Sequence, residues 1–299
     1  MVEIDIGPNI IAGLFGASII FSWHGFFSFV AVLIAVLLVG RWAHLSGRTD
    51  INADIVYSIA IWCIIGGIIG ARIVHVIDHW GSIYSQKPLL SFAIWQGGIG
   101  MWGGILGGFV GGAIYAAWNR YPVGAIADLA APVMLFVQSI GRLGDIVNGE
   151  HCAKALDGIF GFVWTHPDSL ARVFCNNGFS APGGEVYSAH PVIVYQIFWN
   201  LFALFVVWNL RHRIKPDGML FAVYLSLYSV GRFVVSLFRE DRIWMWGLQE
   251  AHFIALLILI ICLPLLILKA RIVKPTLIPV KGLSIPQYQT TTRAQRRRN

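Results

Sequence analysis

Residues 250–271, EAHFIALLILIICLPLLILKAR, determine the fold class, because an unbroken apolar run lies there between an acidic and a basic end. A helix needs about 20 mostly apolar residues to cross the hydrocarbon core of a bilayer. Six further segments share this length and character. The predicted spans are residues 18–40, 54–78, 97–118, 123–147, 190–210, 218–238 and 250–271. The sequence therefore predicts an all-α membrane protein, a seven-transmembrane-helix bundle.

Composition and charge support this prediction and give an orientation. The 299 residues are 57% hydrophobic and 12% charged, which is more apolar surface than one soluble core can bury. Fourteen Lys and Arg residues outside the spans or at their very ends fall on one side and five on the other. Since cationic loops stay cytoplasmic, the N-terminus is expected outside the membrane and the C-terminus inside. The basic run 296–298 then favours anionic lipid headgroups over nucleic acid.

We expect residues 1–272 to form the seven-helix membrane domain, with residues 148–189 as a small extracytoplasmic cap. The basic cytoplasmic tail, residues 273–299, is expected to be disordered. The cap segment contains Cys152 and Cys175. An oxidising compartment permits a disulfide between them, but two free thiols are an open alternative.

Two interleaved Gly-x-x-x-Gly series mark the third predicted span, at positions 100, 104, 108 and 112 and at 103, 107 and 111. Small residues at this spacing let two helix backbones approach closely. The series therefore predicts tight packing against a neighbouring helix.

Ionisable side chains within spans are costly and usually face a partner or a polar cavity. The candidates are Arg72, Asp78, Asp128, Arg142, Asp145 and Arg232. Asp128 starts the fourth span, where a carboxylate interacts favourably with the helix N-terminus, so we expect it to be structural.

The decapeptide 141–150, GRLGDIVNGE, holds four polar side chains at the end of the fourth span. Arg142, Asp145 and Asn148 follow at intervals of three and share one helix face. The alternatives are an internal ion pair that fixes helix packing and a functional site.

A polar stripe marks the sixth span. Tyr224, Tyr228, Arg232 and Arg239 lie within about 80° of one another on a helical projection. Two arginines beside two tyrosines at bilayer depth indicate a cavity that holds an anion.

Four histidines need separate consideration. Arg72, His75 and His79 share one face of the second span, but an arginine there repels a cation, so no metal site is expected. His24 and His190 lie at the starts of the first and fifth spans. Each is either an interfacial residue or a base that titrates near neutrality.

The decapeptide resembles the signature of the bacterial prolipoprotein diacylglyceryl transferases, Gly-Arg-x-Gly-Asn-Phe-x-Asn-x-Glu. Supporting matches follow in the family's order over about two thirds of the chain. They are residues 70–72, 95–98, 103–104, 190–191, Tyr195, Tyr228, Arg232, Phe238 and Arg239. The resemblance implies transfer of a diacylglyceryl group from phosphatidylglycerol to the lipobox cysteine thiol of a prolipoprotein signal peptide, with release of glycerol phosphate.

The resemblance also implies roles for individual residues. Guanidinium groups neutralise a leaving phosphate. A thiol has an unperturbed pKa of about 8.5, so it needs a base or a cationic neighbour to become a thiolate. The expected catalytic residues are His24, Arg142, Glu150, Arg232 and Arg239, with His24 or Glu150 accepting the thiol proton. The expected substrate-binding residues are Arg72, Gln96, Gly97, Gly98, Trp102, Asp145, Asn148, His190, Tyr195 and Tyr228. No cofactor is expected.

The sequence departs from the family pattern at five positions. Trp102 stands in place of the histidine that is the family's usual base, and indole accepts no proton. His24 stands in place of a tyrosine and Asp145 in place of the signature asparagine. Ala153 replaces a glycine and Gln196 a glutamate.

Two alternatives stay open, the first because of these departures and the second because of the buried arginines. One is a related membrane enzyme that uses the same phospholipid site with a different acceptor. The other is an anion transporter, which the lack of visible repeated halves disfavours.

Overall fold

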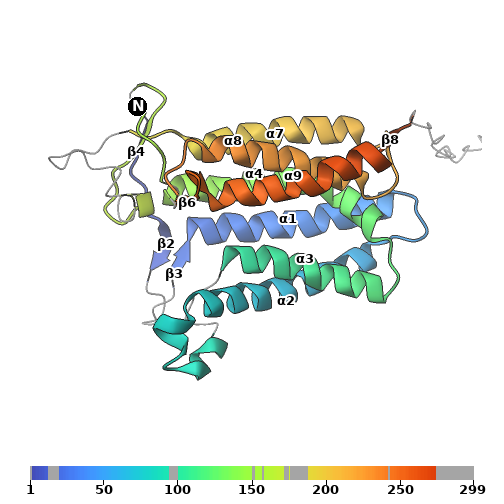
Figure 1. Ribbon diagram of the computed structural model, residues 1–299, viewed down its shortest axis with the longest axis horizontal. Helices are drawn as coiled ribbons and strands as arrows, with labels where there is room; N and C mark the ends of the chain where they lie inside the picture. Colours follow the sequence, from blue (N-terminus) through green and yellow to red (C-terminus); the bar gives the residue numbers. More distant parts are fainter. Residues whose placement is uncertain are drawn as a thin grey trace, which may run out of the picture.

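The computed structural model describes residues 2–12, 20–93, 100–149, 152–156, 158–171, 175, 188–241 and 243–273. Seven α-helices dominate this part of the chain and run roughly parallel to one another (Figure 1). They are α1 (Trp23–Leu45), α2 (Ala53–Asp78), α3 (Met101–Trp118), α4 (Val123–Asn148), α7 (Val192–Leu210), α8 (Met219–Ser236) and α9 (Glu250–Lys269). This architecture confirms the predicted all-α membrane fold.

Six of these helices are long and apolar enough to cross a membrane. The exception is α3, whose fully described part, Gly103–Trp118, is shorter. The first three residues of its predicted span, 97–99, lie outside the described residues. The count of seven spans therefore stays a prediction, while multi-pass insertion follows from the six long apolar helices.

Short two-stranded sheets lie at both ends of the bundle (Figure 1). Strand β1 (Val2–Ile4) pairs in parallel with β4 (Phe162–Trp164), β2 (Asn9–Ala12) pairs with β3 (Ile20–Ser22), and β6 (Ile243–Met245) pairs with β7 (Leu248–Gln249). These three pairs define what we call the β2 end of the bundle. Strands β5 (Ile214–Lys215) and β8 (Arg271–Ile272) pair at the opposite end, the β8 end. The described chain thus starts and finishes at opposite ends of the bundle.

Local sequence signals explain where the helices begin and end. The Ser22 hydroxyl accepts a hydrogen bond from the Gly25 amide at 3.1 Å and caps α1, and Asn52 caps α2 in the same way. Helix α4 follows Pro122 and ends at Gly149, whose φ of 66° lies in the left-handed region that glycine tolerates. Two further short helices, η2 (Trp80–Tyr84) and η3 (Pro88–Phe92), follow α2.

Helix α4 is the centre of the bundle. It packs against α1 on one side and against α7 and α8 on the other. Val133 and Val137 enter the cluster shared with α1 and α2, while Ala131 and Leu135 enter the cluster shared with α7 and α8. Because α4 packs closely against α1, α7 and α8, its side chains are well placed to form a shared interior site.

Asp128 was expected to interact with the N-terminus of its own helix, α4, but it stabilises a different helix. Its carboxylate accepts hydrogen bonds from the backbone amides of Gly218 and Phe221, each at 2.8 Å. These amides are unpaired donors at the start of α8, so Asp128 caps α8 rather than its own helix α4. The sequence alone does not show which helix N-terminus lies beside this carboxylate.

The glycine series of α3 packs directly against α2, which confirms the predicted close approach. A β-carbon added at Gly70 would lie 2.2 Å from the carbonyl oxygen of Gly103, and one at Gly107 would lie 2.3 Å from that of Gly66. Only hydrogen fits at these crossings, so the two backbones touch along the α2–α3 contact.

We expect Gly70→Ala to destabilise the protein by about 1–3 kcal/mol, because the new methyl group collides with backbone that cannot rotate away. Thermal unfolding in detergent measures this loss. The matched control is Gly81→Ala, where an added β-carbon meets no atom within 4 Å. Equal unfolding temperatures for the two variants would contradict the close packing.

Candidate active site

The first turn of α1 lies directly on α4 because residue 144 has no side chain. A β-carbon at Gly144 would lie 2.7 Å from His24 Cα and 3.0 Å from the Trp23 carbonyl oxygen. Any larger residue would push α1 away. Gly144 therefore brings His24 within reach of the polar residues at the end of α4.

His24, Asp145 and Arg142 form a linked charge cluster. His24 Nδ1 lies 2.6 Å from Asp145 Oδ1, and Arg142 Nη1 donates to Asp145 Oδ2 at 2.6 Å. The Asp145 side chain is 3% exposed and that of His24 is 45% exposed. A buried carboxylate is stable only when it is paired and hydrogen-bonded, and here both oxygens are engaged.

The Asp145 carboxylate also fixes the tautomer of His24. A carboxylate only accepts hydrogen bonds, so His24 Nδ1 carries a proton towards Asp145. The neutral ring then presents an unprotonated Nε2, the arrangement that an acidic residue imposes on a histidine base. The sequence predicted that Arg142 and Asp145 share a face, and their ion pair confirms it. The link to His24 was missed, because it depends on the packing of α1 on α4.

A second arginine approaches this cluster from α8. Arg232 is half-buried and within electrostatic range of Arg142, Arg239, Tyr228 and the Asp241 carboxylate. Tyr228 is hydrogen-bonded to Arg142. Among the described residues, Arg232 makes no hydrogen bond or ion pair with a carboxylate. Guanidinium groups of the fourth and sixth predicted spans therefore lie within electrostatic range of one another.

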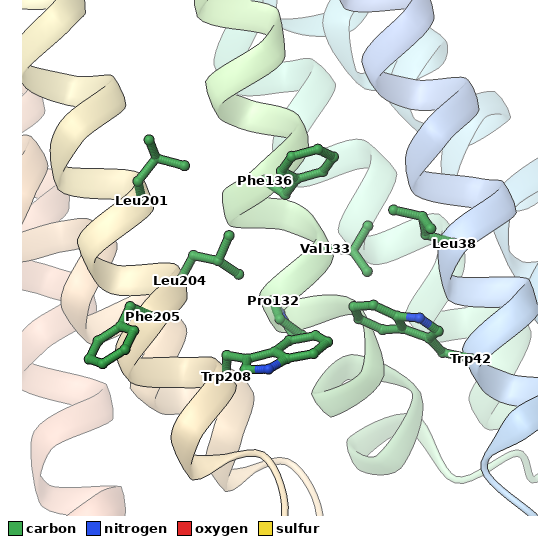
Figure 2. Close-up of a pocket in the computed structure, with 9 residues that line it drawn as sticks. All are labelled: Leu38, Trp42, Pro132, Val133, Phe136, Leu201, Leu204, Phe205 and Trp208. Carbon is green, nitrogen blue, oxygen red and sulfur yellow. The ribbon is translucent and has the colours of Figure 1, made fainter.

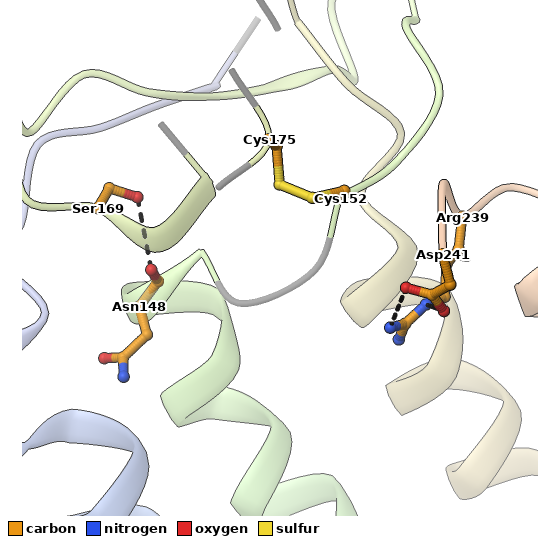
Figure 3. Close-up of a disulfide and its surroundings, with 6 residues drawn as sticks. All are labelled: Asn148, Cys152, Ser169, Cys175, Arg239 and Asp241. Atoms are coloured by element: carbon orange, nitrogen blue, oxygen red, sulfur yellow. Dashed lines mark hydrogen bonds and ion pairs between the residues drawn. A yellow bond between two sulfur atoms is a disulfide. The ribbon is translucent and has the colours of Figure 1, made fainter. Parts of the chain in front are cut away.

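Arg239 was expected to bind an anion from the helical stripe of α8, but it lies beyond the end of that helix and is paired with a carboxylate. Helix α8 ends at Ser236, so the helical projection does not extend to Arg239. Its guanidinium donates to both carboxylate oxygens of Asp241, at 2.7 and 2.9 Å, and its side chain is 7% exposed (Figure 3). Arg239 is thus already bound bidentately by a carboxylate. Asp241, which the sequence analysis did not single out, balances this part of the site.

The segment after α4 is attached to the end of α8. Ala153 forms a β-bridge with Arg239, and the Glu240 amide donates to the Cys152 carbonyl at 3.1 Å. Cys152 and Cys175 form a disulfide, which settles the alternative left open by the sequence (Figure 3). The Ser169 hydroxyl donates to the Asn148 carbonyl at 3.4 Å. Hydrogen bonds thus connect the described parts of this segment to the ends of α4 and α8, and one disulfide links two of those parts to each other.

Two further predicted residues, His190 and Tyr195, lie beside this attachment. His190 Nδ1 is 3.2 Å from the Tyr195 hydroxyl, and the His190 ring lies 5.1 Å from that of Phe238. The three rings pack as one aromatic cluster where the chain enters α7. Deeper in the bundle, Tyr224 accepts a hydrogen bond from Gln138 at 2.9 Å.

Arg72 lies in a different part of the bundle. It is 7% exposed, its Nε donates to the Ser91 carbonyl at 2.8 Å, and its Nη2 donates to the Leu90 carbonyl. The guanidinium also lies 5.4 Å from the centre of the Tyr84 ring. These contacts hold η2 and η3 against α2, so Arg72 has a structural function whether or not it also binds substrate.

Several predicted residues cannot be placed. Gln96, Gly97, Gly98 and Glu150 lie outside the described residues, and only the backbone of Trp102, in the first turn of α3, is described. Within the described ranges, no group of three or more His, Cys, Asp or Glu residues is arranged to hold a metal ion. His75 and His79 instead stack at a ring separation of 4.2 Å.

Comparison with known proteins gives a consistent result. The family model for prolipoprotein diacylglyceryl transferase matches residues 12–268. Three phosphatidylglycerol–prolipoprotein diacylglyceryl transferases illustrate the similarity. The protein of Trichormus variabilis is 33% identical over 85% of this chain and 84% of its own length, and that of Nostoc sp. is 34% identical with the same coverage. The protein of Symbiobacterium thermophilum is 30% identical over 89% of this chain and 91% of its own length. The chain belongs to the prolipoprotein diacylglyceryl transferase family.

Proposed function

We propose that this chain transfers a diacylglyceryl group from phosphatidylglycerol to the lipobox cysteine thiol of a prolipoprotein. The observation that carries the proposal is the position of Arg232. It is a half-buried cation beside Arg142 that makes no ion pair with a carboxylate of the described chain. A cation at bilayer depth is costly, and an anionic phosphate offsets that cost.

The reaction forms one bond and breaks one. The cysteine sulfur attacks the glyceryl carbon that carries the phosphate, and the carbon–oxygen bond to phosphate breaks. The bonding electrons leave with the phosphate oxygen, so glycerol phosphate departs with one more negative charge than the diester had. Donors that meet this developing charge lower the barrier. Arg232 and Arg142 are the proposed donors.

The thiol proton goes to His24 Nε2. Asp145 holds the ring through Nδ1 and stabilises the imidazolium that forms. This geometry favours His24 as the base, and Glu150 stays a second candidate. His24 would then replace the basic function that Trp102 cannot supply.

We place the β2 end of the bundle on the outer side of a bacterial plasma membrane, with the C-terminal tail in the cytoplasm. The distribution of Lys and Arg supports this orientation. The disulfide also supports it, because disulfides persist in oxidising compartments. Both substrates, an outer-leaflet phospholipid and a secreted precursor, would then reach His24 and Arg232 from the same side.

The remaining predicted residues would bind and orient the substrates. Tyr228 and Asn148 lie next to the charge cluster, on α8 and α4. His190 and Tyr195 would contact the signal peptide where α7 meets the segment above it. Arg72, Gln96, Gly97, Gly98 and Trp102 keep their predicted substrate-binding function. Arg239 would position the site through its pair with Asp241.

We expect Arg232→Gln to lower the transfer rate about 100- to 1000-fold, because the leaving phosphate loses a charged donor. Purified protein is incubated with labelled phosphatidylglycerol and a lipobox peptide, and thioether-linked lipid is quantified. The control is Arg213→Gln, which removes an arginine at the β8 end and should leave the rate unchanged. If the wild-type protein released glycerol phosphate without forming the thioether product, the acceptor would be a different one. If it formed neither product, the proposed reaction would be refuted.

We expect the rate to fall as the pH drops below the pKa of His24, because a protonated Nε2 cannot accept the thiol proton. His24→Gln should lower the rate and abolish this acidic limb. Rate profiles with the same lipid and peptide test this dependence. His44→Gln, at the opposite end of the same helix, should keep the wild-type profile. An acidic limb that persists in His24→Gln would exclude His24 as the base.

A further inference from the structure

A crevice opens on the side of the bundle at the β8 end, far from the charge cluster. It has a volume of about 420 Å³, within the usual size range of ligand sites, and lies between α1, α4 and α7 (Figure 2). Its lining residues are Leu38, Trp42, Pro132, Val133, Phe136, Leu201, Leu204, Phe205 and Trp208. Trp42 is 18 residues beyond His24 on α1, so the crevice lies roughly 27 Å along the helix from the proposed base.

The crevice has the character of a lipid-chain site. All of its lining residues are apolar or aromatic, and its outer wall is exposed on a helix long and apolar enough to cross a membrane. Phe205 is 67% exposed and Leu201 is 43% exposed. From Leu201 to Trp208 the wall of α7 extends roughly 10 Å. The opening therefore faces the hydrocarbon of the surrounding bilayer.

One end of the crevice is closed by aromatic rings and carries a positive charge. Trp42 and Trp208 pack at a ring separation of 5.4 Å, and the Arg211 guanidinium lies 3.8 Å from the centre of the Trp208 ring. Arg211 Nη1 donates to the Trp208 carbonyl at 2.7 Å, which fixes the guanidinium over the indole. Tryptophans followed by a cation mark the level of lipid headgroups.

We propose that this crevice binds one acyl chain of an anionic phospholipid in the leaflet at the β8 end, with its phosphate on Arg211. An anionic phospholipid matches both the apolar walls of the crevice and the guanidinium at its end. The apolar walls accept the chain, and the remaining guanidinium N–H groups of Arg211 donate to phosphate oxygens. Arg213, in the turn that follows α7, adds positive charge, which favours an anionic over a zwitterionic lipid. Lys215, in β5, is paired with Asp217 at 3.1 Å and adds little. The site is separate from the proposed catalytic site and does not depend on the proposed function.

The test uses full-length protein in lipid nanodiscs. Photoactivatable phosphatidylglycerol and phosphatidylcholine, each with the reactive group on an acyl chain, are compared by peptide mass spectrometry. We expect phosphatidylglycerol to label the α4 and α7 peptides that line the crevice about fivefold more than phosphatidylcholine. Leu204→Trp should abolish this labelling by filling the crevice, and Arg211→Gln should remove the preference for the anionic lipid.

Two controls keep the result interpretable. Leu257→Trp adds the same side chain on the exposed face of α9 and should leave labelling unchanged. Arg213→Gln removes a neighbouring charge that does not stack on Trp208 and should preserve most of the preference. Equal labelling by both lipids, or labelling that persists in Leu204→Trp, would overturn the proposal. So would cross-links between two copies of α7, which would assign the crevice to self-association. A failed transferase assay with intact labelling would refute only the proposed function.

Discussion

The buried carboxylate of Asp145 is the constraint on which the candidate site depends. Ionising a carboxylate away from water costs several kcal/mol, and pairing offsets that cost only when the geometry is good. Here one oxygen meets His24 from α1 and the other meets Arg142 from α4 itself. The carboxylate therefore fixes the start of α1 against the end of α4. The close contact at Gly144 makes this arrangement sterically possible.

Asp145 also changes what Arg142 can do. A guanidinium already paired with a carboxylate attracts phosphate less than an unpaired one, so Arg232 becomes the more available cation. In the proposed reaction, the strength of the Arg142–Asp145 pair changes as the thiol is deprotonated. When His24 takes up the thiol proton, Asp145 faces an imidazolium and its negative charge is more fully compensated. Arg142 can then turn more of its charge to the leaving phosphate. One carboxylate would thus couple proton transfer to leaving-group stabilisation.

The sequence predicted those features that depend on residues close together in the chain. The apolar runs gave the helices, the glycine spacing gave the α2–α3 contact, and the interval of three gave the Arg142–Asp145 pair. Contacts between residues far apart in the chain were not predicted from the sequence. The link from His24 to Asp145 and the capping of α8 by Asp128 depend on which helices are neighbours. Arg239 was assigned to a helical stripe because its sequence does not show that α8 ends three residues earlier.

The two halves of helix α4 differ in chemistry, one polar and one apolar. Its C-terminal half places Gln138, Arg142 and Asp145 towards α1 and α8, where each of these side chains has a partner on another helix. Its N-terminal half places Pro132, Val133 and Phe136 against an apolar crevice. Polar pairing is directional and tolerates little displacement, whereas apolar packing is not directional. The charged half therefore sets the relative positions of α1, α4 and α8. The apolar half can leave a gap between α1 and α7 without unpairing any polar group, which explains why the crevice lies at the end of the bundle away from the charge cluster.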